Sequence, residues 1–266
     1  MIGDADVEAY ERDGAVCLRG VISRAWLEKL AHGVERNLRE PGPMAKRYTK
    51  EGRPGFFFGD YCNWQRIEEY EAFFRHSPAA EIAGRLMRSS KVNVYHEHVL
   101  VKEPGTEEPT PWHQDQPYYP IDGRDVLSLW IPLDPVEQGV CPEFVAGSHA
   151  QGKWYQPKRF VDGAAHQATD PGFEPVPDVE ADRAAYRLLS WALEPGDCIA
   201  FGGLTLHGAP ANRSANRRRA FSARWTGDDA VFRKRQGFMS PPPPAAGGPA
   251  EGAAMDSDIF PVVWRA

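Results

Sequence analysis

The chain has 266 residues, of which 42% are hydrophobic, and this is enough to build a substantial core without disulfides or structural metals. Lysine and arginine number 31 against 37 aspartates and glutamates, a net charge of −6, and no basic run is longer than Arg217 to Arg219. This balance excludes a surface specialised for nucleic acid or anionic membranes. The sequence has no signal-peptide pattern, no run of roughly 18 apolar residues and no CxxC pair, so we expect a cytoplasmic protein with four reduced cysteines.

The N-terminal third predicts a mostly helical layer. A short helical pattern ends at Gly14, and a strand follows over residues 15–21. Ser23 is a suitable N-cap for the next helix, whose apolar residues recur at helical spacing. Residues 39–64 are rich in glycine, proline and aromatic residues, which indicates an ordered loop, and residues 65–89 again predict helix.

Strands dominate from Lys91 onward. Segments rich in β-forming residues cover 91–102, 125–134, 197–208 and 218–227, with turns but no crossover helices between them. Such strands pair antiparallel, so the pattern predicts a mainly β fold of sandwich or barrel type with peripheral helices.

The remaining segments complete one expected domain over residues 1–266. Residues 154–187 are irregular and acidic, which is typical of a lid, and residues 240–254 form a low-complexity loop. The last twelve residues carry aromatic side chains and are expected to dock back on the core. We therefore divide the domain into a helical layer at about 1–90, a β core at about 91–235 and a C-terminal tail at 240–266.

The stretch "PWHQDQPYYP" at residues 111–120 contains a candidate metal site. His113 and Asp115 lie two residues apart on an extended segment, so both side chains point the same way. Taken alone, this pair is as consistent with a polar loop. His207 lies 92 residues after Asp115, at the end of the strand predicted over 197–208, and two histidines with one carboxylate suit non-haem Fe(II). The basic cluster after His207 offers a cation for a dicarboxylate.

Four motifs resemble the phytanoyl-CoA dioxygenase family of Fe(II)- and 2-oxoglutarate-dependent oxygenases. They are "ERDGAVCLRGVIS", "PTPWHQDQPYY", "LSLWIPLDPVEQGVCPEFVAGSH" and "LEPGDCIAFGGLTLHGAPANRSANRRRAFSARW", and they follow in the family's order over nearly the whole chain. The resemblance implies a double-stranded β-helix, a jelly roll of cupin type, with iron held by His113, Asp115 and His207. It also implies that Arg218, eleven residues after His207, binds 2-oxoglutarate, while Arg217 and Arg219 face solvent.

The resemblance also suggests further contacts with the co-substrate. His96, His98 and Lys102 share one face of the strand before the iron motif, where the family places co-substrate or substrate contacts. Both histidines are equally consistent with hydrogen-bonded core residues. Trp130 matches a position that lines the oxoglutarate pocket in the family, although a tryptophan in such a strand is often simply core. Where many relatives have a serine or threonine two residues after the distal histidine, this chain has Ala209.

The substrate side of the site is predicted from the residues around the iron motif. Gln116 and Tyr118 follow the motif, and Arg224 shares the inward face of its strand with Arg218, so we expect all three to contact substrate. Asp115 favours hydroxylation or another oxidation over halogenation, because related iron halogenases lack this carboxylate. We expect a monomer or homodimer in which O2 reacts with a small molecule, and secondary metabolites are the class of substrate that we expect. The remaining histidines are expected to be structural, namely His32, His76, His149 and His166.

Two other functions compete with this interpretation. A zinc hydrolase can use two histidines and one aspartate, but it gives no reason for an arginine eleven residues after the distal histidine. A non-catalytic β-helix that binds small molecules is the other alternative. The presence of His113, Asp115, His207 and Arg218 together argues against the loss of turnover.

Overall fold

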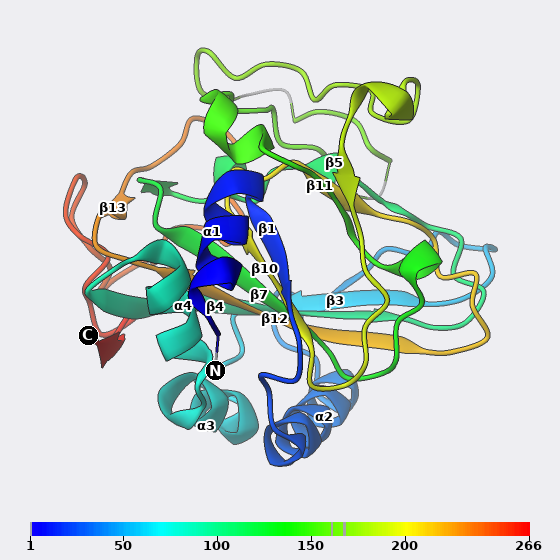
Figure 1. Ribbon diagram of the computed structural model, residues 1–266, viewed down its shortest axis with the longest axis horizontal. Coiled ribbons are helices and arrows are strands. Elements are labelled where there is room, and N and C mark those ends of the chain that lie inside the picture. The colour runs from blue at the N-terminus through cyan, green and yellow to red at the C-terminus, as the bar shows by residue number, and fades with distance from the viewer. Residues whose placement is uncertain (1, 161, 167–168) are drawn as a thin grey trace.

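Two antiparallel β-sheets pack face to face and form the framework of the molecule (Figure 1). The computed structural model describes residues 2–160, 162–166 and 169–266. The larger sheet contains, in spatial order, β1 (Ala15–Leu18), β10 (Cys198–Gly202), β7 (Val126–Pro132), β12 (Arg218–Thr226), β4 (Lys91–Lys102), β3 (Phe57–Tyr61) and β2 (Lys46–Arg47), with β14 (Val262–Arg265) beside β4. The smaller sheet contains β5 (Thr110–His113), β11 (His207–Ala209), β8 (Glu143–Val145) and β9 (Leu188–Leu189), and a separate pair joins β13 (Val231–Phe232) to β6 (Ile121–Asp122). The fold is mainly β, a double-stranded β-helix of cupin type, as the sequence predicted.

Helices cover the outer face of the larger sheet, on the side away from the smaller sheet (Figure 1). The α-helices are α1 (Asp4–Asp13), α2 (Arg24–Arg39), α3 (Glu68–His76) and α4 (Ala79–Met87). Single 3₁₀ turns occur at η1 (Gln116–Tyr118), η2 (Gln138–Val140), η3 (Ser148–Gln151) and η4 (Arg183–Ala185). No helix in the described ranges is long and apolar enough to cross a membrane.

Strand β12 shows how the two faces of the larger sheet differ. Phe221 and Trp225 point toward the helices, where they are fully buried, and their ring centroids lie 6.0 and 4.9 Å from that of Phe74 on α3. Burial of side chains this large contributes about 1.5–3 kcal/mol each. The alternate residues Arg218 and Arg224 point between the sheets. Because side chains alternate along β12, one face of the strand packs in the hydrophobic core under the helices and the other faces the polar space between the sheets.

Three predicted elements differ from the structure. The helix predicted over 65–89 is two helices, because Pro78 has no backbone N–H to continue α3. The strand predicted over 15–21 ends at Leu18. The strand predicted over 197–208 is also divided, since β10 ends in the larger sheet at Gly202 and the chain crosses to the smaller sheet before β11 begins. His207 is thus the first residue of a strand, and the expectation that it ends one is wrong.

Both the N-terminal third and the C-terminal end of the chain add strands to the larger sheet. Strands β1, β2 and β3 come from the segment predicted as a helical layer, so that layer is helical only in part. The last residues dock back as expected, because β14 pairs with β4 and the Asn93 amide donates a 2.9 Å hydrogen bond to the Phe260 carbonyl. All three predicted parts of the chain meet in one sheet.

Candidate metal centre

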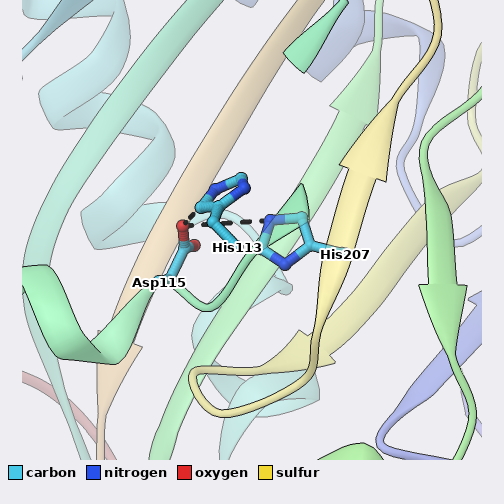
Figure 2. Close-up of side chains that lie close together, drawn as sticks. All are labelled: His113, Asp115 and His207. Carbon is cyan, nitrogen blue, oxygen red and sulfur yellow. Dashed lines mark ion pairs between the residues drawn. The ribbon is translucent and has the colours of Figure 1, made fainter. Parts of the chain in front are cut away.

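Three ligand-type side chains converge between the two sheets (Figure 2). His113 ends β5 and lies directly opposite His207, which begins the neighbouring β11. Asp115 follows on the turn into η1. Its Oδ1 lies 3.4 Å from His113 Nε2 and 3.9 Å from His207 Nε2, and the three donor atoms all lie within 4.8 Å of one another. The antiparallel register of two strands thus brings together residues that are distant in sequence.

Backbone carbonyls orient both imidazole rings. His113 Nδ1 lies 2.8 Å from the Pro111 carbonyl, and His207 Nδ1 lies 2.9 Å from the Thr205 carbonyl. A proton on each Nδ1 satisfies these bonds and leaves each Nε2 with a lone pair toward Asp115. Burial, together with the nearby His113, lowers the pKa of His207 to about 3, so this ring is neutral. Two imidazoles whose Nε2 atoms face Asp115 can bind a metal ion together with its carboxylate.

The outer oxygen of Asp115 is held separately. Asp115 Oδ2 accepts hydrogen bonds from Ser128 Oγ at 3.2 Å and from Arg224 Nη2 at 3.3 Å, while Arg224 Nε donates to the Tyr119 hydroxyl at 2.6 Å. Burial alone would raise the pKa of Asp115, but Arg224 and the two histidines lower it well below its ordinary value. The carboxylate is therefore ionised, with Oδ1 free to face the two imidazoles.

Two buried cations lie beyond the histidines. Arg218 on β12 is directly opposite Lys102 on β4. In the described ranges, neither cation has a carboxylate within ion-pair distance, and their hydrogen bonds go to backbone carbonyls, from Arg218 to Val140 and from Lys102 to Glu108 and Pro210. Burial lowers the pKa of Arg218 to about 10, and burial and Arg218 together lower the pKa of Lys102 far below its usual value. An unpaired buried guanidinium is costly, so an anionic ligand would be strongly favoured there.

One cavity of about 350 Å³ connects the metal-ligating residues with Arg218. The sequence-predicted residues that line it are His96, His98, His113, Asp115, Tyr118, Trp130, His207, Arg218 and Arg224. The Nε2 atoms of His96 and His98 are buried and lack a hydrogen-bond partner among the described residues. Burial and the nearby Arg224 lower the pKa of His96 to about 3, and that of His98 also falls well below its usual value. Both rings are neutral and have one ring nitrogen available to a bound molecule.

Two predicted contacts fall outside the cavity wall. The Gln116 amide donates to the carbonyls of Ile121 and Gly123, at 3.3 and 2.8 Å, so it holds the turn around β6 and does not line the cavity. Lys102 lies behind the wall, with its ammonium 4.4 Å from the centroid of the Phe57 ring. The geometry therefore disagrees with two predictions, namely that Lys102 contacts the co-substrate directly and that Gln116 contacts the substrate.

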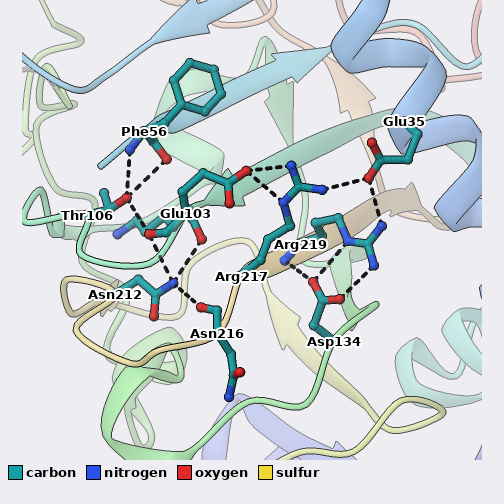
Figure 3. Close-up of polar contacts among 10 residues, drawn as sticks. Glu35, Phe56, Glu103, Thr106, Asp134, Asn212, Asn216, Arg217 and Arg219 are labelled. Atoms are coloured by element: carbon teal, nitrogen blue, oxygen red, sulfur yellow. Dashed lines mark hydrogen bonds and ion pairs between the residues drawn. The ribbon is translucent and has the colours of Figure 1, made fainter. Parts of the chain in front are cut away.

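Arg217 and Arg219 point away from the cavity but are not simply solvated (Figure 3). Arg217 pairs with Glu103 at 2.6 Å, Arg219 pairs with Asp134 at 2.7 Å, and both reach Glu35 on α2 at 2.9 Å. The predicted direction of these side chains agrees with the structure, and the ion pairs are contacts that the sequence did not indicate. Figure 3 shows that these ion pairs connect the helical layer to β12.

Several lining or supporting residues were not identified from the sequence. Trp130 was predicted from its match to a family position, and Ser128 lies two residues before it on β7, so alternation along this strand could have indicated Ser128 as well. Thr110 lines the cavity and is the cross-strand partner of Ala209, which only the register reveals. Phe160 comes from the irregular segment and lies 4.7 Å from the His113 ring, measured between centroids. No local pattern could have indicated Phe160, because its position depends on the path of a long loop.

Fold and donor set together define the protein as one of the cupin-type proteins with a two-histidine, one-carboxylate centre. Its sequence matches the phytanoyl-CoA dioxygenase (PhyH) family over residues 10–220. The chain therefore belongs to the phytanoyl-CoA dioxygenase family, as its motifs predicted. It is thus an enzyme of the dioxygenase class. It is 22% identical over 247 residues to a probable phytanoyl-CoA dioxygenase of Caenorhabditis elegans, covering 83% of this chain and 74% of that protein.

Solved structures share the fold at low sequence identity. The epimerase SnoN, solved in complex with Fe3+, alpha ketoglutarate and nogalamycin RO, superposes with a TM-score of 0.77 at 22% identity, over 98% of each chain. The carbocyclase SnoK of nogalamycin biosynthesis has a TM-score of 0.74 at 22% identity, covering 99% of this chain and 97% of its own. AviO1 of Streptomyces viridochromogenes has a TM-score of 0.63 at 21% identity, over 84% and 94% of the two chains. These likenesses support the double-stranded β-helix.

Proposed function

We propose that the protein is an Fe(II)- and 2-oxoglutarate-dependent dioxygenase that hydroxylates an unactivated C–H bond of a small molecule. One observation carries this proposal. The three donor atoms of His113, Asp115 and His207 face the same cavity as Arg218, a buried cation without an acidic partner among the described residues. A metal triad beside an anion-binding arginine fits a metal that works with a carboxylate co-substrate.

The metal would be held by the two Nε2 atoms and by Asp115 Oδ1. With iron and 2-oxoglutarate bound, O2 would oxidise both the C–H bond and 2-oxoglutarate, which gives the hydroxylated product, succinate and carbon dioxide. The carbonyls of Pro111 and Thr205 hold the two imidazoles in orientation. Ser128 and Arg224 bind the outer Asp115 oxygen, which leaves its inner oxygen for the metal.

The distal carboxylate of 2-oxoglutarate would pair with Arg218. A guanidinium binds a carboxylate through two parallel hydrogen bonds, and its burial in the cavity wall strengthens them. Thr110 would supply the hydroxyl that Ala209 lacks, because it is paired with Ala209 across the strands and lines the same cavity. Trp130 would pack against the carbon chain, and Lys102 would act indirectly, through its position opposite Arg218.

The substrate is proposed to be a free small molecule of secondary metabolism, which reacts with O2. A cavity of about 350 Å³ is of the size that small ligands occupy. Asp115 supports hydroxylation over halogenation because it fills the coordination position that a halide would need. The cysteines are free thiols, which supports the proposed cytoplasmic location.

Anaerobic addition of Fe(II) and 2-oxoglutarate tests the proposal. We expect a weak visible charge-transfer band that is absent in His113→Ala and retained in the control His76→Ala, since His76 is exposed at the end of α3. Consumption of 2-oxoglutarate across a compound library then identifies the substrate class. A parent protein that gives no band contradicts the assignment of iron and oxoglutarate, and hydrolysis supported by Zn(II) alone would favour a zinc hydrolase.

A further inference from the structure

The cavity has a buried inner end and an exposed outer end. The metal triad and Arg218 belong to the inner end, because all four side chains are buried. Among the lining residues that remain partly or fully exposed, six mark the mouth, namely Lys46, Lys158, Arg159, Phe160, His166 and Phe238. Phe238 is 36% exposed, the one large hydrophobic side chain so exposed in the described ranges. The expectation that His166 is merely structural does not account for its position at this mouth.

Flat rings line the path from the mouth to the metal ligands. His166 and Phe238 stack in parallel, with centroids 4.0 Å apart and an angle of 4° between the rings. Tyr118 continues the path, since its ring centroid lies 6.4 Å from that of Phe238 and 6.0 Å from that of His113. Aromatic faces arranged in this way favour a planar ligand, which can make offset-stacked or edge-to-face contacts with several of them.

The charge at the mouth is positive. Lys46 lies 5.9 Å from the ring centroids of both Tyr61 and Phe238, and it has no carboxylate within ion-pair distance in the part of the chain that the structure describes. Lys158 adds further positive charge, whereas Arg159 is paired with Asp162 at 2.6 Å. Asp115 is the one acidic residue on the described cavity wall, and it is already engaged by Arg224 at the inner end. A ligand anion that enters the mouth would therefore meet an unpaired cation, Lys46, beside the aromatic path.

We propose that the mouth is a subsite for a planar aromatic acid, and that Lys46 binds the anionic group of the substrate. Phe238 and Tyr61 contact the ring system, while the opposite end of the substrate points toward His113. This inference rests on the proposed function for the direction in which the substrate enters, but the subsite itself binds its ligand without metal or oxoglutarate. The substrate class is thus an aromatic carboxylate or phenolate.

The subsite is tested by calorimetric titration of the full-length, metal-free protein with 2-naphthoate, 2-naphthamide and cyclohexanecarboxylate. We expect 2-naphthoate to bind best. Lys46→Gln should weaken 2-naphthoate about fivefold, the upper range for a partly exposed ion pair, and leave 2-naphthamide unchanged. Lys50→Gln removes the same charge from an exposed site outside the cavity and should change neither. Phe238→Ala should weaken both aromatic probes.

The inner arginine provides the decisive comparison. Retention of 2-naphthoate binding in Arg218→Gln, with weakening in Lys46→Gln, locates the carboxylate at the mouth. The reverse pattern places the probe in the proposed oxoglutarate site and overturns the inference. It is also overturned by equal effects of Lys46→Gln and Lys50→Gln, by equal affinity for cyclohexanecarboxylate, or by no binding of 2-naphthoate at millimolar concentration. Since no metal is present, failure here is independent of the result of the charge-transfer experiment.

Discussion

Replacing the buried Arg218 by glutamine is expected to stabilise the ligand-free protein while removing most of its affinity for 2-oxoglutarate. The guanidinium is 6% exposed and has a carbonyl, that of Val140, as its hydrogen-bond acceptor among the described residues. Its charge has no nearby carboxylate to compensate the loss of hydration. Glutamine keeps a donor for Val140 and removes the charge.

The two effects have different magnitudes. Charge-assisted hydrogen bonds contribute about 1.5–3 kcal/mol each, so loss of the paired bonds to a carboxylate should weaken 2-oxoglutarate at least about a hundredfold. Burying an uncompensated charge costs several kcal/mol of folding free energy, and its removal recovers part of this cost. Loss of the hydrogen bond to Val140 would subtract about 1 kcal/mol from the gain. We expect a net gain of about 1 kcal/mol, which raises Tm by about 2–4 °C in a chain of this size.

Thermal unfolding measured with and without Mn(II) and 2-oxoglutarate separates these effects. The parent protein should gain stability from the ligand pair beyond that from metal alone, and Arg218→Gln should not. Arg217→Gln is the matched control, because it removes exposed ion pairs with Glu103 and Glu35 at a cost of about 0.5–1 kcal/mol and should leave the oxoglutarate effect intact. The reasoning is refuted if both variants lose stability equally and both keep the oxoglutarate effect.

Two further substitutions test the supporting residues. Thr110→Val keeps the shape of the side chain and removes its hydroxyl, so the KM for 2-oxoglutarate should rise about fivefold to tenfold. An unchanged KM would mean that Thr110 does not replace the hydroxyl that is absent at Ala209. Arg224→Gln should weaken Co(II) binding about tenfold to a hundredfold, because Asp115 loses a partner that holds its outer oxygen. If Co(II) affinity is unchanged and only the KM for substrate rises, Arg224 acts as the substrate contact that the sequence predicted.

The inner end of the cavity was largely predictable because its residues obey local rules. Alternation along β12 correctly placed Arg218 and Arg224 on one face, and the motif at residues 111–120 gave two of the three triad residues. His207 was identified even though the bounds of its strand were predicted wrongly. A histidine followed by a glycine and a basic cluster was recognisable whether it ended a strand or began one.

The outer end was not predictable from local patterns. Lys46 lies on a two-residue strand and Phe160 on the irregular segment, so their approach to the cavity depends on how long loops fold over the sheets. Gln116 shows the opposite problem. Its place directly after Asp115 indicated a substrate contact, but the turn into η1 directs its amide to the backbone around β6. Sequence proximity to a metal ligand is a poor guide once the chain leaves the extended conformation.

The run Arg217 to Arg219 shows how alternation gives three identical side chains different tasks. The outer two bind Glu35 on α2, and their further partners Glu103 and Asp134 come from the loops that follow β4 and β7. These ion pairs fasten the start of β12 to the helical layer and to the neighbouring strands. Together with the ladders to β4 and β7, they hold Arg218 in register. In the proposed function, the lack of an acidic partner among the described residues leaves this buried cation to pair with a bound carboxylate.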